Sequence, residues 1–259
     1  MDPAIASLRD LIGHARRIAV FTGAGISTES GIPDFRGPNG IWTKYDPSEF
    51  TIQNFLRSTE SRRRYWRRSG EMYRQILASR PNAAHLAVAR LEAEGRLGAV
   101  ITQNVDGLHQ AAGNSPGRVI ELHGTALDVA CLSCGARQSR QAFQPQVQED
   151  GTAPDCPRCG GLIKPATISF GQSLVPDVVN KAEEETEASD LFLVVGSSLQ
   201  VYPAAGLPLL AASRGTPLAI VNMQETPHDG YAQVVVRGMA GEVLSAAATP
   251  RASPVPLPV

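Results

Sequence analysis

The chain has 259 residues, of which 42% are hydrophobic and 19% are charged, so it can bury a full core as one large domain, alone or with a small insert. Its formal net charge of -1 gives no electrostatic reason for tight binding to nucleic acid or to an anionic membrane, and we expect neither as a partner. No segment approaches the roughly 20 apolar residues that span a bilayer. The stretch from Met1 to Asp10 lacks the features of an export or import signal, so we expect a cytoplasmic protein.

The hydrophobic pattern predicts alternating helices and strands. An amphipathic helix is expected over residues 4–16, a buried strand over 18–21 and a mostly helical block over 47–79. Further strands are expected over residues 97–102, 118–122, 191–195 and 218–221. These strands end in small or polar residues, and a doubly wound sheet binds ligands beyond the carboxyl ends of its strands. The pattern therefore predicts an α/β fold with a Rossmann-type doubly wound parallel sheet.

The first predicted strand runs directly into the turn Gly23-Ala24-Gly25. Glycines allow the backbone to approach a pyrophosphate, which the N–H groups of a following helix would meet, and Ser27 adds a further small residue. Thr28 stands where the third glycine of Gly-x-Gly-x-x-Gly belongs, and no second strand ending in an acidic residue follows. These omissions count against a hydride-transfer enzyme. The alternative interpretation is a strand-turn-helix junction that binds no ligand.

All four cysteines lie in a Gln-, Gly- and Pro-rich interval over residues 131–165, which we interpret as a small insert. They form two pairs, Cys131-x-x-Cys134 and Cys156-x-x-Cys159, separated by about 21 residues, a spacing typical of tetrahedral zinc sites. A disulfide is disfavoured in the cytosol, and a redox Cys-x-x-Cys motif needs no second copy. Four thiolates leave no open coordination position, so we expect one structural zinc ion that takes no part in chemistry.

Several short motifs occur along the chain. They are Gly-Ala-Gly-Ile-Ser at 23–27, Gly-Ile-Pro-Asp-Phe-Arg at 31–36, Thr-Gln-Asn-Val-Asp-Gly-Leu-His at 102–109, Glu-Leu-His-Gly at 121–124, the four cysteines, and Gly-Ser-Ser-Leu-Gln-Val at 196–201. Together they resemble the sirtuin family of NAD-dependent protein lysine deacylases, most closely its class II and bacterial members, and they occur in the family's order over about residues 5–245.

The resemblance implies two domains with substrate bound in the cleft between them. Residues 1–36, 82–125 and 170–246 would form a discontinuous Rossmann-type NAD-binding domain. The smaller domain would combine a cofactor-loop and helical part over residues 37–81 with a zinc-binding part over residues 126–169. We expect the proline-rich residues 247–259 to be a disordered tail.

The resemblance also implies a set of catalytic and NAD-binding residues. His123 matches the catalytic base, although a single histidine at a strand end is more commonly a structural hydrogen-bonding group. Asn104 and Asp106 match catalytic positions that, with Gln103, surround the nicotinamide and its ribose. Phe35 would shield C1′ of that ribose after nicotinamide leaves. The remaining expected NAD contacts are Gly23, Ala24, Gly25, Ser27, Asp34 and Arg36 in the phosphate and cofactor loops, and Gly196, Ser197, Ser198, Asn222 and Ala240 toward the distal phosphate and adenosine.

The implied reaction consumes NAD without a redox step. The acyl-lysine carbonyl oxygen attacks C1′ of the nicotinamide ribose, and nicotinamide departs. His123 then deprotonates a ribose hydroxyl, and breakdown releases lysine and O-acyl-ADP-ribose, a step that an imidazole near neutral pKa can assist. Mono-ADP-ribosyl transfer to a protein nucleophile is the alternative enzymatic interpretation. A zinc-ribbon module that senses NAD without catalysis is the alternative outside enzymes.

The expected partners are acylated lysine proteins or peptides. Ile168 and Phe170 would line the acyl-lysine tunnel, and the loop at Gly171 and the segment at Val201 would pair with the backbone of an extended substrate. Core packing alone also explains Ile168 and Phe170. Relative to the usual family pattern, Ser169 replaces an aromatic residue and Gln172 replaces a carboxylate. The tunnel is therefore altered.

A further motif, Arg-Tyr-Trp-Arg-Arg at 64–68, bears on the choice of acyl group. Tyr65 and Arg68 lie three residues apart on one helical face, and desuccinylating sirtuins hold the acyl carboxylate with a Tyr-x-x-Arg pair. If Arg68 points into the pocket, its guanidinium would favour acidic acyl groups such as succinyl or glutaryl. The alternative is that Tyr65 and Trp66 belong to the core and Arg68 to the surface.

Overall fold

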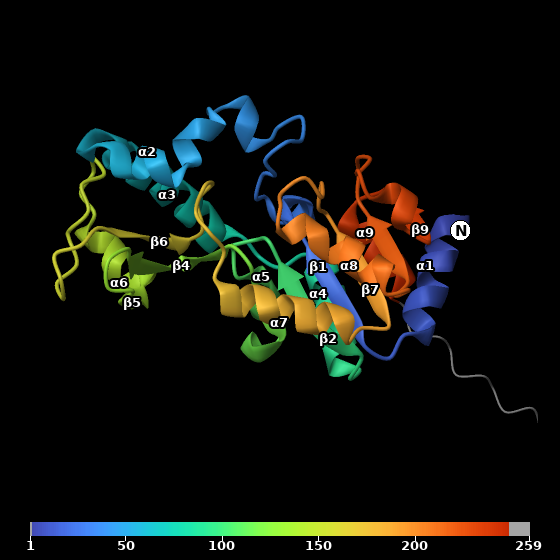
Figure 1. Cartoon of the computed structure of the whole chain (residues 1–259). Helices are drawn as coiled ribbons and strands as arrows, with labels where there is room; N and C mark the ends of the chain where they lie inside the picture. The colour runs from blue at the N-terminus through green and yellow to red at the C-terminus, as the bar shows by residue number, and fades with distance from the viewer. Residues whose placement is uncertain (1, 249–259) are drawn as a thin grey trace, which may run out of the picture.

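A six-stranded parallel sheet forms the larger of two lobes in the computed structural model, which describes residues 2–248 (Figure 1). Its strand order is β3-β2-β1-β7-β8-β9. The strands are β1 (Ile18–Thr22), β2 (Leu97–Thr102), β3 (Val119–Glu121), β7 (Leu191–Val195), β8 (Leu218–Val221) and β9 (Val234–Val236). After β3 the chain crosses to the far side of β1, so the winding reverses between β1 and β7. This reversal is the point at which such sheets open a ligand crevice.

Helices cover both faces of this sheet, as a doubly wound fold requires. One face packs against α1 (Pro3–His14), α4 (Ala83–Ala93) and α9 (Ala240–Ala247). The opposite face packs against α7 (Pro176–Glu187) and α8 (Leu207–Ser213). In β1, Ile18 and Val20 join the first core while Ala19 and Phe21 join the second, which explains why these four consecutive residues are all apolar.

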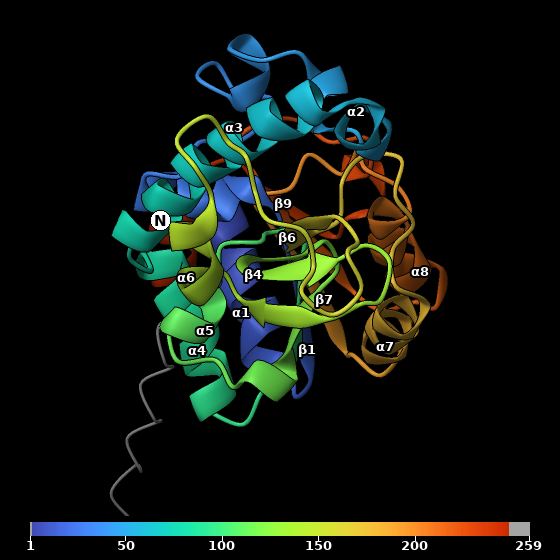
Figure 2. The same ribbon diagram turned by 90° about the vertical axis from the view of Figure 1, so that its left-hand side faces the viewer.

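The smaller lobe contains an antiparallel sheet in the order β5-β4-β6 and lies beside a helical segment (Figures 1 and 2). Its elements are β4 (Gly124–Cys131), β5 (Arg137–Ser139), α6 (Arg140–Phe143) and β6 (Ile163–Thr167), with α2 (Ile52–Arg57) and α3 (Thr59–Ala78). Phe55, Trp66 and Phe143 from these helices pack with the strands in one buried cluster. Backbone pairing thus orders much of an insert in which the sequence shows little periodicity.

Short elements complete the described part of the chain. They are η1 (Ala24–Ser30), η2 (Ile41–Thr43), η3 (Pro47–Phe50), α5 (Leu108–Ala111), η4 (Pro116–Arg118), η5 (Gln144–Gln146), η6 (Ala204–Gly206) and η7 (Asp229–Tyr231). The helix expected after the first glycine turn is η1, a 3-10 helix that Gly31 ends with a φ of 84°. The predicted tail over residues 247–259 lies outside the described residues, apart from Ala247, the last residue of α9, and Ala248.

Within residues 2–248, no helix combines the length and the apolar character needed to cross a bilayer.

Candidate active site

A cavity of about 870 Å³ lies where the carboxyl ends of β1, β2 and β7 face α3 and the end of β6. Every residue that the sequence assigns to catalysis, NAD binding or substrate binding lines it, except Ala240. Ala240 is 6% exposed and packs into the core under the sheet. Its backbone neighbour Gly241 donates its N–H to Glu29 Oε2 at 2.7 Å. The structure therefore gathers one site from segments that are far apart in the sequence.

Two glycine turns interlock at the floor of the cavity. The Gly25 N–H donates to the Gly196 carbonyl at 2.8 Å, and a Cβ on Gly25 would lie 2.8 Å from the Gly196 backbone. Gly196 has a φ of 65°, and a Cβ there would lie 2.2 Å from the nitrogen of Ile26. Neither position tolerates a side chain, because the two turns pack directly against each other, and both turns line the cavity where a diphosphate would approach. This cradle fits the phosphates of NAD.

A hydrogen-bond network fixes the polar residues that follow β2. Asn104 Nδ2 donates to the Gly23 carbonyl and to Ser27 Oγ, both at 3.1 Å. Asp106 is 7% exposed, and its Oδ2 accepts from Ser27 Oγ at 2.7 Å while its Oδ1 accepts from the Leu108 N–H at 3.0 Å. Because Asn104 and Asp106 form their hydrogen bonds within the protein, this wall of the cavity is preorganised before any ligand binds.

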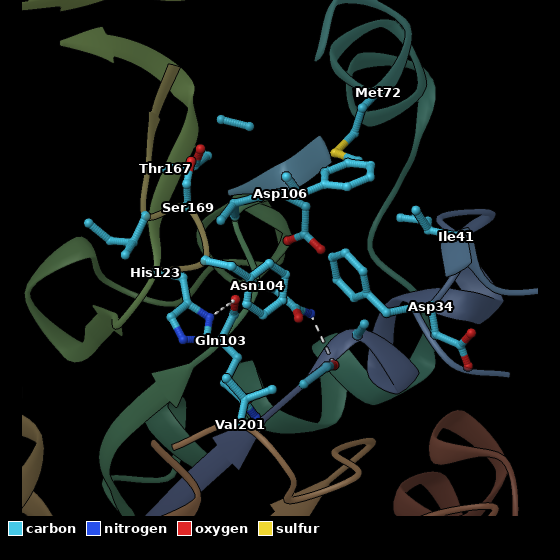
Figure 3. Close-up of a pocket in the computed structure, with 18 of the residues that line it drawn as sticks. Asp34, Ile41, Met72, Gln103, Asn104, Asp106, His123, Thr167, Ser169 and Val201 are labelled. Carbon is cyan, nitrogen blue, oxygen red and sulfur yellow. Dashed lines mark hydrogen bonds between the residues drawn. The ribbon is translucent and has the colours of Figure 1, made fainter. Parts of the chain in front are cut away.

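His123 stands at the end of β3 with its imidazole facing the cavity (Figure 3). Its Nδ1 lies 3.0 Å from the Gln103 carbonyl, which can only accept, so Nδ1 carries the proton and Nε2 keeps its lone pair. Burial lowers the pKa of His123 below its usual value. Gln103 in turn donates from Nε2 to Ser197 Oγ at 2.7 Å, which ties the histidine to the β7 turn. His123 is thus held neutral, with a free base nitrogen.

The predicted cofactor loop is joined to the substrate side by an aromatic chain. The Phe35 ring lies 5.1 Å from Trp42, and Trp42 lies 5.8 Å from Phe170, centroid to centroid. Asp34 accepts the Gly37 N–H at 2.8 Å, which stabilises the turn in the loop. Arg36 is exposed at the rim of the cavity. The cofactor loop therefore contacts Phe170 through the ring of Trp42.

The four cysteines converge in the small lobe. Their sulfur atoms all lie within 4.8 Å of one another, with 3.5 Å between Cys131 and Cys159 and 3.8 Å between Cys134 and Cys156. A tetrahedral site with Zn–S bonds of about 2.3 Å needs sulfur atoms about 3.8 Å apart. None of the four forms a disulfide. The cluster fits a structural zinc ion, as the spacing predicts.

Residues 23–203 match the sequence profile of the Sir2 family. The chain belongs to the Sir2 family. The resemblance to sirtuins is confirmed, and with it the Rossmann-type fold with its cysteine-bearing lobe. Curated Sir2 relatives match over almost their whole length. The chain is 42% identical to the NAD-dependent protein deacetylase of Rhodopseudomonas palustris, covering 94% of this chain and 96% of that protein. It is 44% identical to NAD-dependent protein deacylase 2 of Archaeoglobus fulgidus, covering 94% of each.

Solved Sir2 structures are equally similar. A complex of Sir2 with a p53 peptide and NAD+ has a TM-score of 0.84 at 37% identity, covering 93% of this chain and 95% of that chain. A structure described as showing the mechanism and regulation of Sir2 enzymes has a TM-score of 0.85 at 42% identity, covering 96% of this chain and 97% of that one.

The Tyr65 and Arg68 side chains diverge within this Sir2 cavity, although both line it. The Tyr65 hydroxyl lies 3.5 Å from Thr167 Oγ1, and its ring packs edge-on against Phe55 at 5.1 Å. Arg68 forms an ion pair with Glu49, and its guanidinium carbon lies 4.7 Å above the Tyr45 ring. The two residues therefore do not converge on one position, and Arg68 already has a carboxylate partner.

Sequence reasoning did not assign several residues that line the Sir2 cavity, among them Ile41, Met72, Arg140 and Thr167. Met72 points into the cavity from α3 (Figure 3). It lies seven residues after Tyr65, so the helical spacing could have placed both on one face. No such signal exists for Arg140, which reaches the cavity from the short helix α6 only through the tertiary fold.

Proposed function

We propose that this chain is an NAD-dependent protein lysine deacylase that transfers an acyl group from lysine to ADP-ribose and releases nicotinamide. One observation carries the proposal. A neutral histidine with a free Nε2 faces the cavity beside a glycine cradle that fits a dinucleotide. Family membership and the names of the curated relatives, deacetylase and deacylase, support the same activity.

The NAD-binding residues that we propose lie along the edge of the large sheet. Gly23, Ala24 and Gly25 would hold the diphosphate at the end of β1, and Gly196, Ser197 and Ser198 would hold the adenosine side with Asn222. Bound NAD supplies an electrophilic ribose carbon with nicotinamide as its leaving group. Asp34, Phe35 and Arg36 form the adjoining loop, and the position of Phe35 at the cavity wall supports its proposed role in excluding water.

The catalytic roles that we propose follow from protonation and hydrogen bonding. His123 Nε2 would take the proton of a ribose hydroxyl, because Nδ1 is already committed to the Gln103 carbonyl. Asn104 and Asp106 would hold the reactants in line, since each is fixed through Ser27. The Asn104 amide keeps its oxygen available, because its hydrogen bonds to the Gly23 carbonyl and to Ser27 Oγ both use Nδ2.

Extended acyl-lysine peptides are the substrates that we propose, bound by backbone pairing at Gly171 and Val201. Phe170 cannot pair with them through its backbone, because its N–H and carbonyl already bond to Phe50 and Ile52 at 3.2 and 3.0 Å. Gly171 has no backbone hydrogen-bond partner within residues 2–248, which leaves it free for a substrate strand. Ile168 and Phe170 would then line the path of the acyl-lysine side chain.

Two further assignments concern organisation and location. We propose the domain division at residues 1–36, 82–125 and 170–246 for NAD binding, and 37–81 with 126–169 for the small domain. The separate buried cluster of Phe55, Trp66 and Phe143 supports the second unit. We also propose that the protein acts in the cytoplasm, which its four unpaired, zinc-compatible cysteines support.

The test follows nicotinamide release and acyl transfer by mass spectrometry with NAD and one peptide carrying acetyl, longer fatty acyl, lipoyl, succinyl or glutaryl lysine. We expect nicotinamide release only with acylated peptide, in equal amounts with O-acyl-ADP-ribose. Release that is indifferent to acylation, together with ADP-ribose on protein, would instead establish mono-ADP-ribosyl transfer. NAD binding without turnover of any peptide would establish the non-catalytic sensor.

A further inference from the structure

Two fully buried cations lie behind the small-lobe wall of the cavity. Arg140 and Lys164 are each 1% exposed. In the part of the chain that the structure describes, neither has a carboxylate oxygen within the 4.0 Å of an ion pair. Arginine and lysine are almost never fully buried without such a partner, because removing a charge from water is costly. This arrangement therefore requires a functional or structural explanation.

Lys164 is satisfied by neutral oxygens. Its Nζ donates to the Pro165 carbonyl at 3.1 Å, to the Thr167 carbonyl at 2.5 Å and to Thr167 Oγ1 at 3.4 Å. All three ammonium protons are used in this way. Lys164 therefore contributes positive charge to the surroundings but no free donor, and it does not itself line the cavity.

Arg140 differs because one of its donors has no partner. Nε donates to Gln144 Oε1 at 2.9 Å and Nη1 to the Ala126 carbonyl at 3.5 Å, while the guanidinium carbon lies 4.4 Å above the Tyr73 ring. Nη2 is buried and bonds to nothing, although Arg140 lines the cavity. Burial lowers the pKa of Arg140 to about 10, as expected for a cation that no anion compensates.

A second unsatisfied group lies on the same side of the cavity. Ser169 is 7% exposed, and its Oγ has no hydrogen bond of normal geometry. Ser169 is nevertheless near enough to the Tyr65 hydroxyl to influence its pKa. Although burial raises the pKa of Tyr65, the nearby Lys164 charge and the hydroxyls of Thr167 and Ser169 outweigh it and lower the pKa. Thr167 and Ser169 are labelled on one wall beside His123 in Figure 3.

We propose that Arg140, assisted by Ser169, binds the carboxylate of an acidic acyl group, so that succinyl-type lysines are the preferred substrates. The inference rests on the proposed deacylase function and names its substrate class. It assigns the cation to the zinc-bearing lobe and not to Arg68, whose guanidinium is already neutralised by Glu49. A carboxylate would pair the buried charge and accept from Arg140 Nη2, which has no partner, and from Ser169 Oγ, whereas a neutral acyl group would leave Arg140 Nη2 unsatisfied.

The test compares succinyl-lysine with butyryl-lysine in one peptide, because both acyl groups contain four carbons and differ in charge. We expect kcat/KM to favour the succinyl peptide by about tenfold or more. Calorimetry without NAD should show the same order of affinity. A wild-type enzyme that prefers butyryl, or that binds both peptides equally, overturns the proposal without any variant.

Variants then locate the cation. Arg140→Met should bring the succinyl-to-butyryl ratio to about one or below, and Ser169→Ala should reduce it by a smaller factor of roughly three to ten. Arg68→Met is the matched control and should retain the preference. Loss of the preference in Arg68→Met with retention in Arg140→Met contradicts the assignment. Thermal unfolding identifies a misfolded Arg140→Met, in which case Ser169→Ala and the wild-type ratio decide.

The two proposals fail in different ways. If no acyl peptide supports nicotinamide release, the deacylase function itself is wrong. If the acetyl and butyryl peptides support release and the succinyl peptide shows no advantage, the deacylase function stands and only the acidic-acyl subsite is wrong.

Discussion

The two walls of the cavity differ in how their polar groups are satisfied. On the large-lobe wall, Asn104, Asp106 and His123 all bond to other groups of the protein, chiefly through Ser27 and the Gln103 carbonyl. On the small-lobe wall, Arg140 Nη2 and Ser169 Oγ are buried and have no hydrogen bond of normal geometry. A satisfied network holds a reacting group in one geometry, whereas an unsatisfied donor costs free energy until a ligand supplies its acceptor.

The two walls face different ligands, of which one is always the same and the other varies. The large-lobe wall faces the part of the cavity proposed for NAD, which is the same in every turnover, and its geometry is complete without ligand. The small-lobe wall faces the proposed acyl position, where chemical identity varies. We infer that catalysis depends on the first wall and acyl selection on the second, and the following predictions test that division.

The largest effect is expected from removal of zinc. A chelator, or the double variant Cys134→Ser and Cys156→Ser, should abolish activity, because the metal holds β4, β5 and β6 together. Hydrogen exchange should show loss of protection in these strands while β1 and β7 remain protected. Ser133→Ala, between the two ligands of one pair, is the control. Full activity at well under one zinc per chain would contradict the structural role.

The next largest effect concerns the proposed base. His123→Ala should lower kcat/KM by about 10² to 10⁴, the usual contribution of general acid–base catalysis. NAD binding, measured by calorimetry, should persist, because the glycine cradle is unchanged. His14→Ala on the exposed end of α1 is the control and should leave both kcat/KM and NAD binding unchanged. Undiminished turnover in His123→Ala would refute the assignment.

The dependence of kcat/KM on pH should reveal the titration of His123 in the wild-type protein. Burial holds the folded pKa of His123 below 6.5, and only the neutral imidazole can accept a proton. Activity should therefore be complete at neutral pH and should fall as the pH drops through a value below 6.5. An acidic limb of kcat/KM with its midpoint above 6.5 would mean that a different group titrates, or that His123 is stabilised as a cation.

The smallest effect is expected at the outer part of the small-lobe wall. The Arg68 and Glu49 side chains are 27% and 31% exposed, so Glu49→Gln should cost at most about 1 kcal/mol of unfolding free energy. Thermal unfolding should shift by less than about 4 °C. The ratio of succinyl to butyryl turnover should stay the same. A strong gain in succinyl turnover would show that Arg68, once released, is the cation that selects the acyl group.

Periodicity predicted the strands that lie inside the large sheet. β2, β7 and β8 have the predicted bounds, and β1 extends by one residue, because strands buried on both faces appear as uninterrupted apolar runs. β9 was missed, since three valines are too short to show a period. β4 and β6 were also missed, because cysteine, glycine and proline interrupt any alternation and pairing across the insert stabilises them instead.

The site residues were likewise predicted where they depend on local spacing and missed where they depend on tertiary packing. Motif spacing brought together the groups of the large-lobe wall, since the carboxyl ends of neighbouring parallel strands meet at one edge of a sheet. Ala240, an expected NAD contact, begins α9 and packs beneath the sheet, so it does not line the cavity and its contact with NAD stays a prediction. Motif spacing also could not show that Arg68 pairs with Glu49, which depends on how η3 packs against α3.

The sequence by itself determined the strands of the large sheet, the cysteine ligands and the glycine turn at Gly23, because each depends on local geometry or fixed spacing. Tertiary structure alone decided which cations are free. Arg68 and Arg140 have the same side chain, and nothing in the sequence distinguishes them. Packing places a carboxylate beside Arg68 and leaves Arg140 with a buried nitrogen that has no partner. Charge compensation is a property of three-dimensional neighbours, and the chain order does not record it.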